Sequence, residues 1–112
     1  MAKNFFIVTK SIGQGSEELG EQLMKNFLYT LARAEQKPEK IFFMNEGVKL
    51  TCEGSASLED LQALEASGVT INSCGTCLDY YKLEDKLLVG KRSGMAQIVE
   101  DMLTLEDSIT IR

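Results

Sequence analysis

Residues 73–81, SCGTCLDYY, hold the side chains best suited to chemistry. Cys74 and Cys77 are separated only by Gly75 and Thr76, and they follow an apolar segment of strand length. Where such a pair opens a helix, the helix N–H groups lower the pKa of the first thiol and favour the nucleophilic thiolate. The second thiol is then close enough to resolve a disulfide or persulfide formed on the first. Taken alone, the motif fits a disulfide staple, half of a metal site, a redox couple or a sulfur carrier.

A zinc site is disfavoured by the ligands that the chain offers. Structural zinc needs four Cys or His ligands. The chain has three cysteines and no histidine, and Cys52 is not part of a second C-x-x-C pair. A metal site would require carboxylate ligands or a site shared between subunits. We therefore expect no metal and no cofactor.

A thioredoxin-type scaffold is also disfavoured. There the C-x-x-C pair comes early and a cis-proline follows it, whereas here the only proline, Pro38, lies upstream of the pair. Cys52 follows an alternating segment and precedes Glu53-Gly54, so we expect a small side chain packed near the sheet edge. A second sulfur-handling thiol is the alternative for Cys52.

The Gly13-Gln14-Gly15 segment resembles part of a nucleotide-binding loop. The dinucleotide fingerprint requires a third glycine at position 18, which is Glu18, and acidic residues in a first helical turn repel phosphate. We interpret the segment as a flexible turn between a strand and a helix. Four residues are expected to line a pocket beside Cys74, namely Gly13, Gly15, Asn45 and Thr76.

Apolar runs predict strands at residues 5–8, 41–44, 69–72 and 108–111, and a strand or extended segment at 87–90. Helices are predicted from Ser16 to Lys37-Pro38, from Ser57 to Gly68, over 77–83, and after Ser93. A capping box is expected at Ser57 and Asp60, and a short irregular or edge segment at 48–51. The apolar positions expected to face inward on the first helix are 19, 23, 24, 27, 28 and 31. On the last helix they are Met95, Ile98, Val99, Met102 and Leu103.

Strands that are apolar throughout and are separated by helices predict a mostly parallel sheet covered on both faces. The fold class is therefore α/β, a three-layer, doubly wound single domain over residues 1–112. In such sheets ligands bind beyond the carboxyl ends of the strands, where Cys74, the segment 11–16 and the segment 45–47 are expected.

Composition restricts the partners. The net charge is −5, with no basic stripe, so nucleic acid and anionic membranes are unfavourable partners. The longest early apolar run, residues 5–8, is too short for a signal sequence or a membrane span, so we expect a cytoplasmic protein with reduced thiols. A small sheet with apolar edges favours homo-oligomers.

The segments NEGVKL (45–50), GVTI (68–71) and CGTCLDYY (74–81) resemble the DsrE-like superfamily, and most closely the C-terminal domain of YedF-type proteins, described as sulfurtransferase-like and involved in selenium metabolism. The resemblance implies a DsrE/F-like fold with flavodoxin-like topology, assembly into oligomers, and a cysteine that carries sulfur or selenium as a persulfide in a relay. Cys74 or Cys77 would be the acceptor. YedF-type proteins usually begin with a TusA-like domain, whereas this sequence begins directly at the DsrE-like part. We therefore expect either a stand-alone version that needs a separate donor, such as a TusA-like protein, or a separated domain.

These observations predict a sulfur carrier in which Cys74 attacks a donor persulfide and Cys77 resolves the product, with separate donor and acceptor proteins. The alternative is a non-enzymatic module that binds a small ligand or forms oligomers, with structural or metal-binding cysteines.

Overall fold

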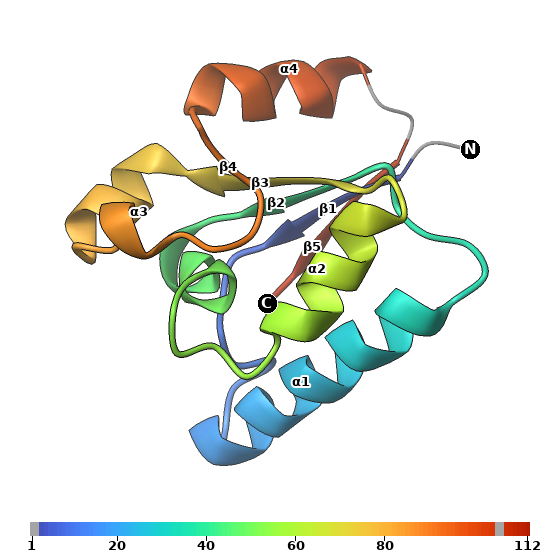
Figure 1. The fold of residues 1–112 in the computed structure, drawn as a ribbon, viewed down its shortest axis with the longest axis vertical. Coiled ribbons are helices and arrows are strands. Elements are labelled where there is room, and N and C mark those ends of the chain that lie inside the picture. The colour runs from blue at the N-terminus through green and yellow to red at the C-terminus, as the bar shows by residue number, and fades with distance from the viewer. Residues whose placement is uncertain (1–2, 105–106) are drawn as a thin grey trace.

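A computed structural model describes residues 3–104 and 107–112, and its centre is a five-stranded sheet in which every pairing is parallel. Figure 1 shows the sheet edge-on, with helices on both sides. The strand order is β4-β3-β2-β1-β5. The strands are β1 (Lys3–Ile7), β2 (Lys40–Phe43), β3 (Thr70–Cys74), β4 (Lys91–Ser93) and β5 (Asp107–Ile111). The predicted doubly wound parallel sheet is confirmed, although this order differs from the flavodoxin order 2-1-3-4-5.

The helices divide between the two faces of the sheet as the strand order requires. The chain steps from β1 outward to β4, and α1 (Glu17–Arg33) and α2 (Leu58–Ala66) make the first two of these crossovers on one face. It then returns to the far side of β1 through α4 (Met95–Thr104), which lies on the opposite face (Figure 1). Right-handed crossovers in opposite directions place helices on opposite faces. The shorter elements are α3 (Gly75–Tyr80) and the 3₁₀-helices η1 (Asn45–Thr51) and η2 (Glu84–Lys86).

The core lies mainly between the sheet and the α1/α2 layer. Phe5 of β1 packs against Phe27 of α1 with ring centroids 6.2 Å apart, and Phe6 and Phe42 lie side by side in register. The largest fully buried side chains include Phe6, Ile7, Met24, Leu28, Ile41, Phe42, Phe43, Leu61, Leu64 and Leu78. Burial of these apolar runs explains why the predicted strand segments pair as they do.

The helix α1 begins as predicted and ends earlier. The Ser16 side chain accepts a hydrogen bond from the Leu19 N–H at 3.1 Å and so caps the helix. The predicted end at Lys37-Pro38 is wrong, because Ala34 is already extended and the chain needs the following residues to reach β2. The predicted inner face is wrong in part, because the buried positions are Gly20, Met24 and Leu28 while Leu19 and Leu23 are exposed.

The predicted capping box of α2 is wrong. Ser57 holds the cap position, but its side chain makes no capping hydrogen bond. Asp60 is buried and accepts a hydrogen bond from Arg33 of α1 at 3.1 Å, with Lys25 3.7 Å from its other oxygen. Asp60 pairs with cations of the neighbouring helix and does not cap its own helix, because burying an unpaired carboxylate costs free energy. The predicted C-terminal glycine is confirmed, since Gly68 has a φ of +108°.

The predicted inward face of α4 is confirmed at Ile98 and wrong at its other four positions. Ile98 and Asp101 are buried, whereas Met95, Val99, Met102 and Leu103 have 47–80% of their surface exposed. Asp101 accepts a hydrogen bond from Lys40 of β2 at 2.9 Å, which fixes the orientation of the helix. Ser93 does not cap the helix, because it pairs with Cys74 as the last residue of β4.

Two connecting segments depart from expectation. Residues 87–90 form neither a strand nor a fully extended segment, because Leu87 makes an isolated antiparallel bridge with Cys52 and residues 89–90 form a bend; the strand follows at Lys91. The segment 48–51, expected to be irregular or an edge, lies within η1. Gly47 of η1 packs so tightly that a Cβ there would collide with the Ile7 carbonyl oxygen. None of the helices in the described residues is long and apolar enough to cross a membrane.

Candidate functional site

Both predicted thiols lie beyond the carboxyl end of β3. Cys74 is the last residue of this strand, and α3 begins at the next residue, Gly75. The two thiols are close together and are not joined by a disulfide. Their surroundings differ, because Cys74 is 4% exposed whereas Cys77 is only half-buried. The site therefore offers one accessible thiol with a second thiol behind it.

Cys77 faces an open cavity of about 540 Å³. The cavity lies where the segments after β1, β2 and β3 meet, which is the region in which parallel sheets bind ligands. Its lining residues are Val8, Met44, Asn45, Cys77, Tyr80 and Tyr81. Apart from Asn45 and the thiol, the surface is apolar or aromatic, and Tyr80 is 78% exposed at the rim. A partner could reach Cys77 from solvent through this opening.

Asn45 supplies a hydrogen bond to the accessible sulfur. Its backbone N–H donates to Cys77 Sγ at 3.1 Å, and Tyr81 Oη donates to Asn45 Oδ1 at 2.6 Å. Asn45 has a φ of +51°, a conformation that asparagine tolerates better than most residues. A donor aimed at sulfur stabilises a thiolate or persulfide anion there.

The surroundings of Cys77 shift its ionisation. Burial raises the pKa of Cys77, and the neighbouring Cys74, by hydrogen bond and by charge, raises it further, while the Asn45 N–H lowers it. Cys77 therefore keeps its proton to higher pH than an ordinary thiol, with its S–H close to the Cys74 sulfur.

An ion pair lies next to the motif. Arg92 of β4 makes a bidentate contact with Asp79 of α3, at 2.8 and 2.9 Å. Hydrogen bonds from Arg92 lower the pKa of Asp79. This pair has no local signature in the sequence, because its members are thirteen residues apart and Lys91-Arg92 suggests only a solvated end of an element.

A second cavity, of about 480 Å³, lies on the other side of Tyr81. The Lys49 ammonium lies 4.5 Å above the Tyr81 ring, and Lys10 and Lys25 also line this cavity. Cys52, 1% exposed, lies in its wall and donates a hydrogen bond to the Val48 carbonyl at 3.2 Å. Cys52 is thus packed as expected, and burial raises its pKa.

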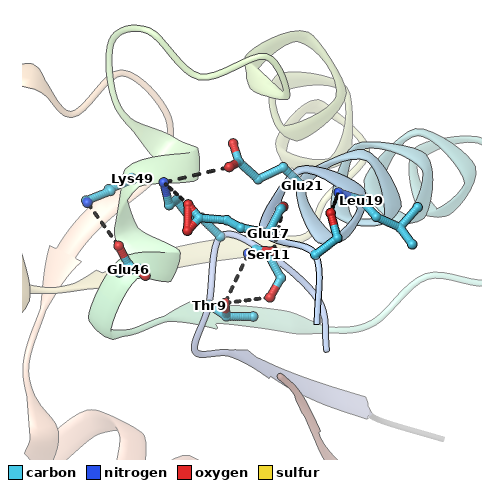
Figure 2. A network of polar contacts seen from close by, with 9 residues as sticks. Thr9, Ser11, Glu17, Leu19, Glu21, Glu46 and Lys49 are labelled. Atoms are coloured by element: carbon cyan, nitrogen blue, oxygen red, sulfur yellow. Dashed lines mark hydrogen bonds and ion pairs between the residues drawn. The ribbon is translucent and has the colours of Figure 1, made fainter. Parts of the chain in front are cut away.

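Figure 2 shows the polar contacts that fix the loop after β1 beside this second cavity. Thr9 Oγ1 donates to the Ser11 carbonyl at 2.7 Å, and Ser11 Oγ donates to the Glu17 carbonyl at 2.9 Å. Across the cavity, Lys49 pairs with Glu46 at 3.2 Å. These contacts join the start of α1 to its neighbouring loop and hold η1 in a defined shape.

The remaining predicted pocket residues lie in different places. Asn45 lines the Cys77 cavity, whereas Thr76 is exposed on α3. Gly13 and Gly15 lie in the exposed loop before α1, with φ values of +82° and +129°. Within residues 3–104 and 107–112, no three His, Cys, Asp or Glu side chains gather as they would around a metal ion.

Comparison with known proteins places the chain in a family. The model of the DsrE/DsrF-like family matches residues 3–110, almost the whole length. The chain belongs to this family. No curated protein matches it.

Solved structures agree with the DsrE-like fold. The ychN protein of Escherichia coli is 19% identical, with a TM-score of 0.73, over 99% of this chain and 100% of that one. MTH1491 of Methanobacterium thermoautotrophicum, described as a protein of unknown function, is 20% identical, with a TM-score of 0.68; the match covers 98% of this chain and 99% of that one. BT1422 of Bacteroides thetaiotaomicron is 15% identical, with a TM-score of 0.67; the match covers 97% of this chain and 94% of that one. At these identities the likeness is one of fold.

Proposed function

We propose that the chain carries sulfur, or selenium, as a persulfide on the Cys74–Cys77 pair, within a relay between a donor and an acceptor protein. The DsrE/DsrF-like family suggests a role related to sulfur relay. The observation that carries the proposal is a pair of free thiols at the carboxyl end of the sheet, one of which faces an open cavity. Two cysteines with a purely structural role would not require an opening to solvent at one of their sulfurs.

Accessibility supports Cys77 as the thiol that receives the sulfur. The sequence predicts attack by Cys74, but Cys74 is 4% exposed, and a donor would meet Cys77 first. The Cys77 thiol lies beside the Cys74 sulfur, so the second thiol is in place to resolve a persulfide formed on the first. The Asn45 N–H would then stabilise the charge on the sulfur.

The proposed chemistry balances without an added oxidant. Cys77 sulfur attacks the outer sulfur of the donor persulfide, the donor S–S bond breaks as the new one forms, and the Cys77 proton leaves with the donor as its thiol. The outer sulfur then passes to an acceptor thiolate, which regenerates Cys77. In the absence of an acceptor, Cys74 attacks the inner sulfur, forms a Cys74–Cys77 disulfide and releases hydrogen sulfide.

The partners are proposals of the same kind. We propose a YedF-like role in the cytoplasm, with a separate TusA-like protein as donor. The exposed apolar side chains of α4, led by Leu103 at 80%, support a homo-oligomer, because contiguous exposed apolar surface is typical of interfaces.

The test is intact mass, with and without reductant, after incubation with a persulfide-generating donor. The expected result is a reductant-sensitive gain of one sulfur atom in the wild type and in Cys52→Ser. Cys77→Ser should gain none, and Cys74→Ser should hold the sulfur longer than the wild type because it cannot form the disulfide. A gain that survives in Cys77→Ser and disappears in Cys74→Ser would return the acceptor role to Cys74. No gain in any sample would contradict the carrier function.

The cavity beside Lys49 supports a second candidate, a small-ligand-binding module. Its volume of about 480 Å³ is within the range typical of ligand pockets. A thermal shift with a small carboxylate that persists in Cys74→Ser would favour this function over the carrier.

A further inference from the structure

Ser57, at the start of α2, has a hydroxyl that the protein leaves without a partner. The residue is 2% exposed and holds the cap position of the helix, yet its side chain makes no capping hydrogen bond. Its backbone N–H donates to Ser55 Oγ at 3.0 Å and its carbonyl accepts from the Leu61 N–H at 3.0 Å, so among the described residues only its hydroxyl is unpaired. A buried hydroxyl without a partner costs free energy. The position therefore indicates a hydrogen-bonding partner from outside the chain, a ligand or a water molecule.

The second cavity, of about 480 Å³, has room for such a partner. Ser57 is one of its lining residues. The first N–H groups of a helix have no partner within the helix, and because the Ser57 side chain does not cap α2, these groups remain available beside the cavity. The N-terminus of a helix also favours negative charge. One end of the cavity therefore offers a hydroxyl and backbone N–H groups, all of which can donate to an anion.

Three lysines bring positive charge to the same cavity, namely Lys10, Lys25 and Lys49. Among the described residues, the Lys10 ammonium comes no closer than 3.6 Å to a carboxylate oxygen, and the Lys25 ammonium no closer than 3.7 Å. These separations are longer than a hydrogen bond. Both ammonium groups therefore keep the capacity to donate to a ligand.

Carboxylates near the cavity limit the affinity that it can have. Glu21 and Glu53 belong to the lining, so three lysines face two glutamates there. Both carboxylates lie 3.8 Å from the ammonium of a lysine, which offsets their charge. Glu59 and Asp60, in the first turn of α2, weaken the positive end of the helix. Binding of an anion is therefore expected to be weak and to fall with added salt.

The rest of the cavity wall is largely apolar. Leu50, Leu83 and the ring of Tyr81 line it and pack against the hydrophobic core. Sites for small molecules typically combine such a wall with a few polar groups that fix the orientation of the ligand. A ligand with an apolar body and one anionic end would satisfy both parts of this cavity.

We propose that the second cavity binds a small organic anion, with its carboxylate on Ser57 and the start of α2 and its apolar body against Leu50 and Leu83. This inference rests on the second candidate function, the small-ligand-binding module, and assigns its ligand class and binding residues. Lys10 and Lys25 supply the nearby positive charge. The site uses neither thiol of the C-x-x-C motif.

The test uses benzoate as the probe, with benzamide as its uncharged counterpart and acetate as a carboxylate without the apolar body. Each is titrated into the isotope-labelled chain and followed by NMR. Benzoate should shift the amide signals of Leu58 and Glu59, and benzamide and acetate should each bind about tenfold more weakly. The amide of Val99, on α4 at the opposite face of the sheet, should not move.

Two substitutions should weaken the binding of benzoate by different amounts. Ser57→Ala should lower the affinity about tenfold, because it removes a donor to a charged group. Lys10→Gln should lower it about threefold, since solvent and salt partly screen this lysine. The matched controls are Ser108→Ala on β5 and Lys91→Gln on β4, both exposed positions, which should leave the affinity unchanged.

Ser57→Asp gives the sharpest test, because stability and binding should respond differently. Aspartate is among the preferred cap residues, so its carboxylate can accept from the free N–H groups of α2, and the temperature of unfolding should not fall. The same carboxylate would take the place of the ligand's carboxylate and repel it. Benzoate should therefore no longer shift the Leu58 and Glu59 signals.

Equal affinities for benzoate and benzamide would overturn the inference, as would an unchanged affinity in both Ser57→Ala and Ser57→Asp. In either case the small-ligand-binding module itself would stand. No shift with benzoate at any concentration would overturn both, and water would then be the partner of the Ser57 hydroxyl. Persulfide loading is measured without benzoate, so the carrier function is tested separately.

Discussion

Cys52 and Cys77 are the same chemical group in two different settings. Cys52 is buried, with only 1% of its surface exposed, and its thiol donates a hydrogen bond to the Val48 carbonyl. Cys77 is half-buried, faces an open cavity and accepts a hydrogen bond from the Asn45 N–H. Burial raises the pKa of both thiols, yet only Cys77 has a donor aimed at its sulfur from the backbone. The difference teaches that access and hydrogen-bond direction separate a packing cysteine from a reactive one.

The rate of alkylation should differ more between Cys77 and Cys52 than any other property. In the native chain Cys77 should react about a thousandfold faster than Cys52, because Cys52 needs an opening of the structure before a reagent can reach it. Mass spectrometry of peptides taken over time measures both rates. In denaturant the two rates should converge. Equal rates in the native chain would mean that Cys52 is accessible in solution.

Serine substitution should separate the two positions by stability. Cys52→Ser replaces a packed sulfur by a smaller polar group and should cost about 1–2 kcal/mol of unfolding free energy. Cys77→Ser at the cavity should cost less than about 0.5 kcal/mol. Urea unfolding followed by circular dichroism gives both values. A larger loss at Cys77 would show that its contact with Asn45 is structural.

The pH dependence of stability should give the smallest difference. The unfolded chain ionises Cys52 near its ordinary pKa of 9.0, whereas the folded chain keeps the proton to higher pH. The unfolded state then binds fewer protons, so stability is intact below this pKa and falls as the pH rises through it. Cys52→Ala should flatten this fall between about pH 8 and about pH 10. If the unfolding free energies of the wild type and Cys52→Ala fall equally with pH in that window, Cys52 is not the source of the pH dependence. Equal slopes of the two proteins below about pH 8 serve as the control.

Much of the fold could be predicted because each strand is a short apolar run that must be covered on both faces. Ile41, Phe42 and Phe43 illustrate this, since all three are buried. The face of α4 could not be predicted. Its amphipathic pattern shows which side chains are apolar but not whether the domain itself covers them, and Lys40 pairs with Asp101 to turn four of them outward.

The candidate site divides in the same way. Cys74 and Cys77 are visible in the sequence because their spacing is local, and Asn45 was expected near them because the carboxyl ends of parallel strands meet. Arg92 was missed, since its contact with Gly75 arises only when β4 pairs with β3. Contacts that depend on strand pairing leave no periodic signal in a single sequence.

The parallel pairing of β1 with β5 has a consequence for synthesis of the chain. Lys3 bonds to Asp107 across 104 residues, so one edge of β1 has no partner until the final strand leaves the ribosome. An apolar strand with an open edge invites pairing with another nascent chain. The sheet is therefore completed only once β5 has been synthesised, and ribosome-bound chains halted before β5 would be the species most in need of a chaperone.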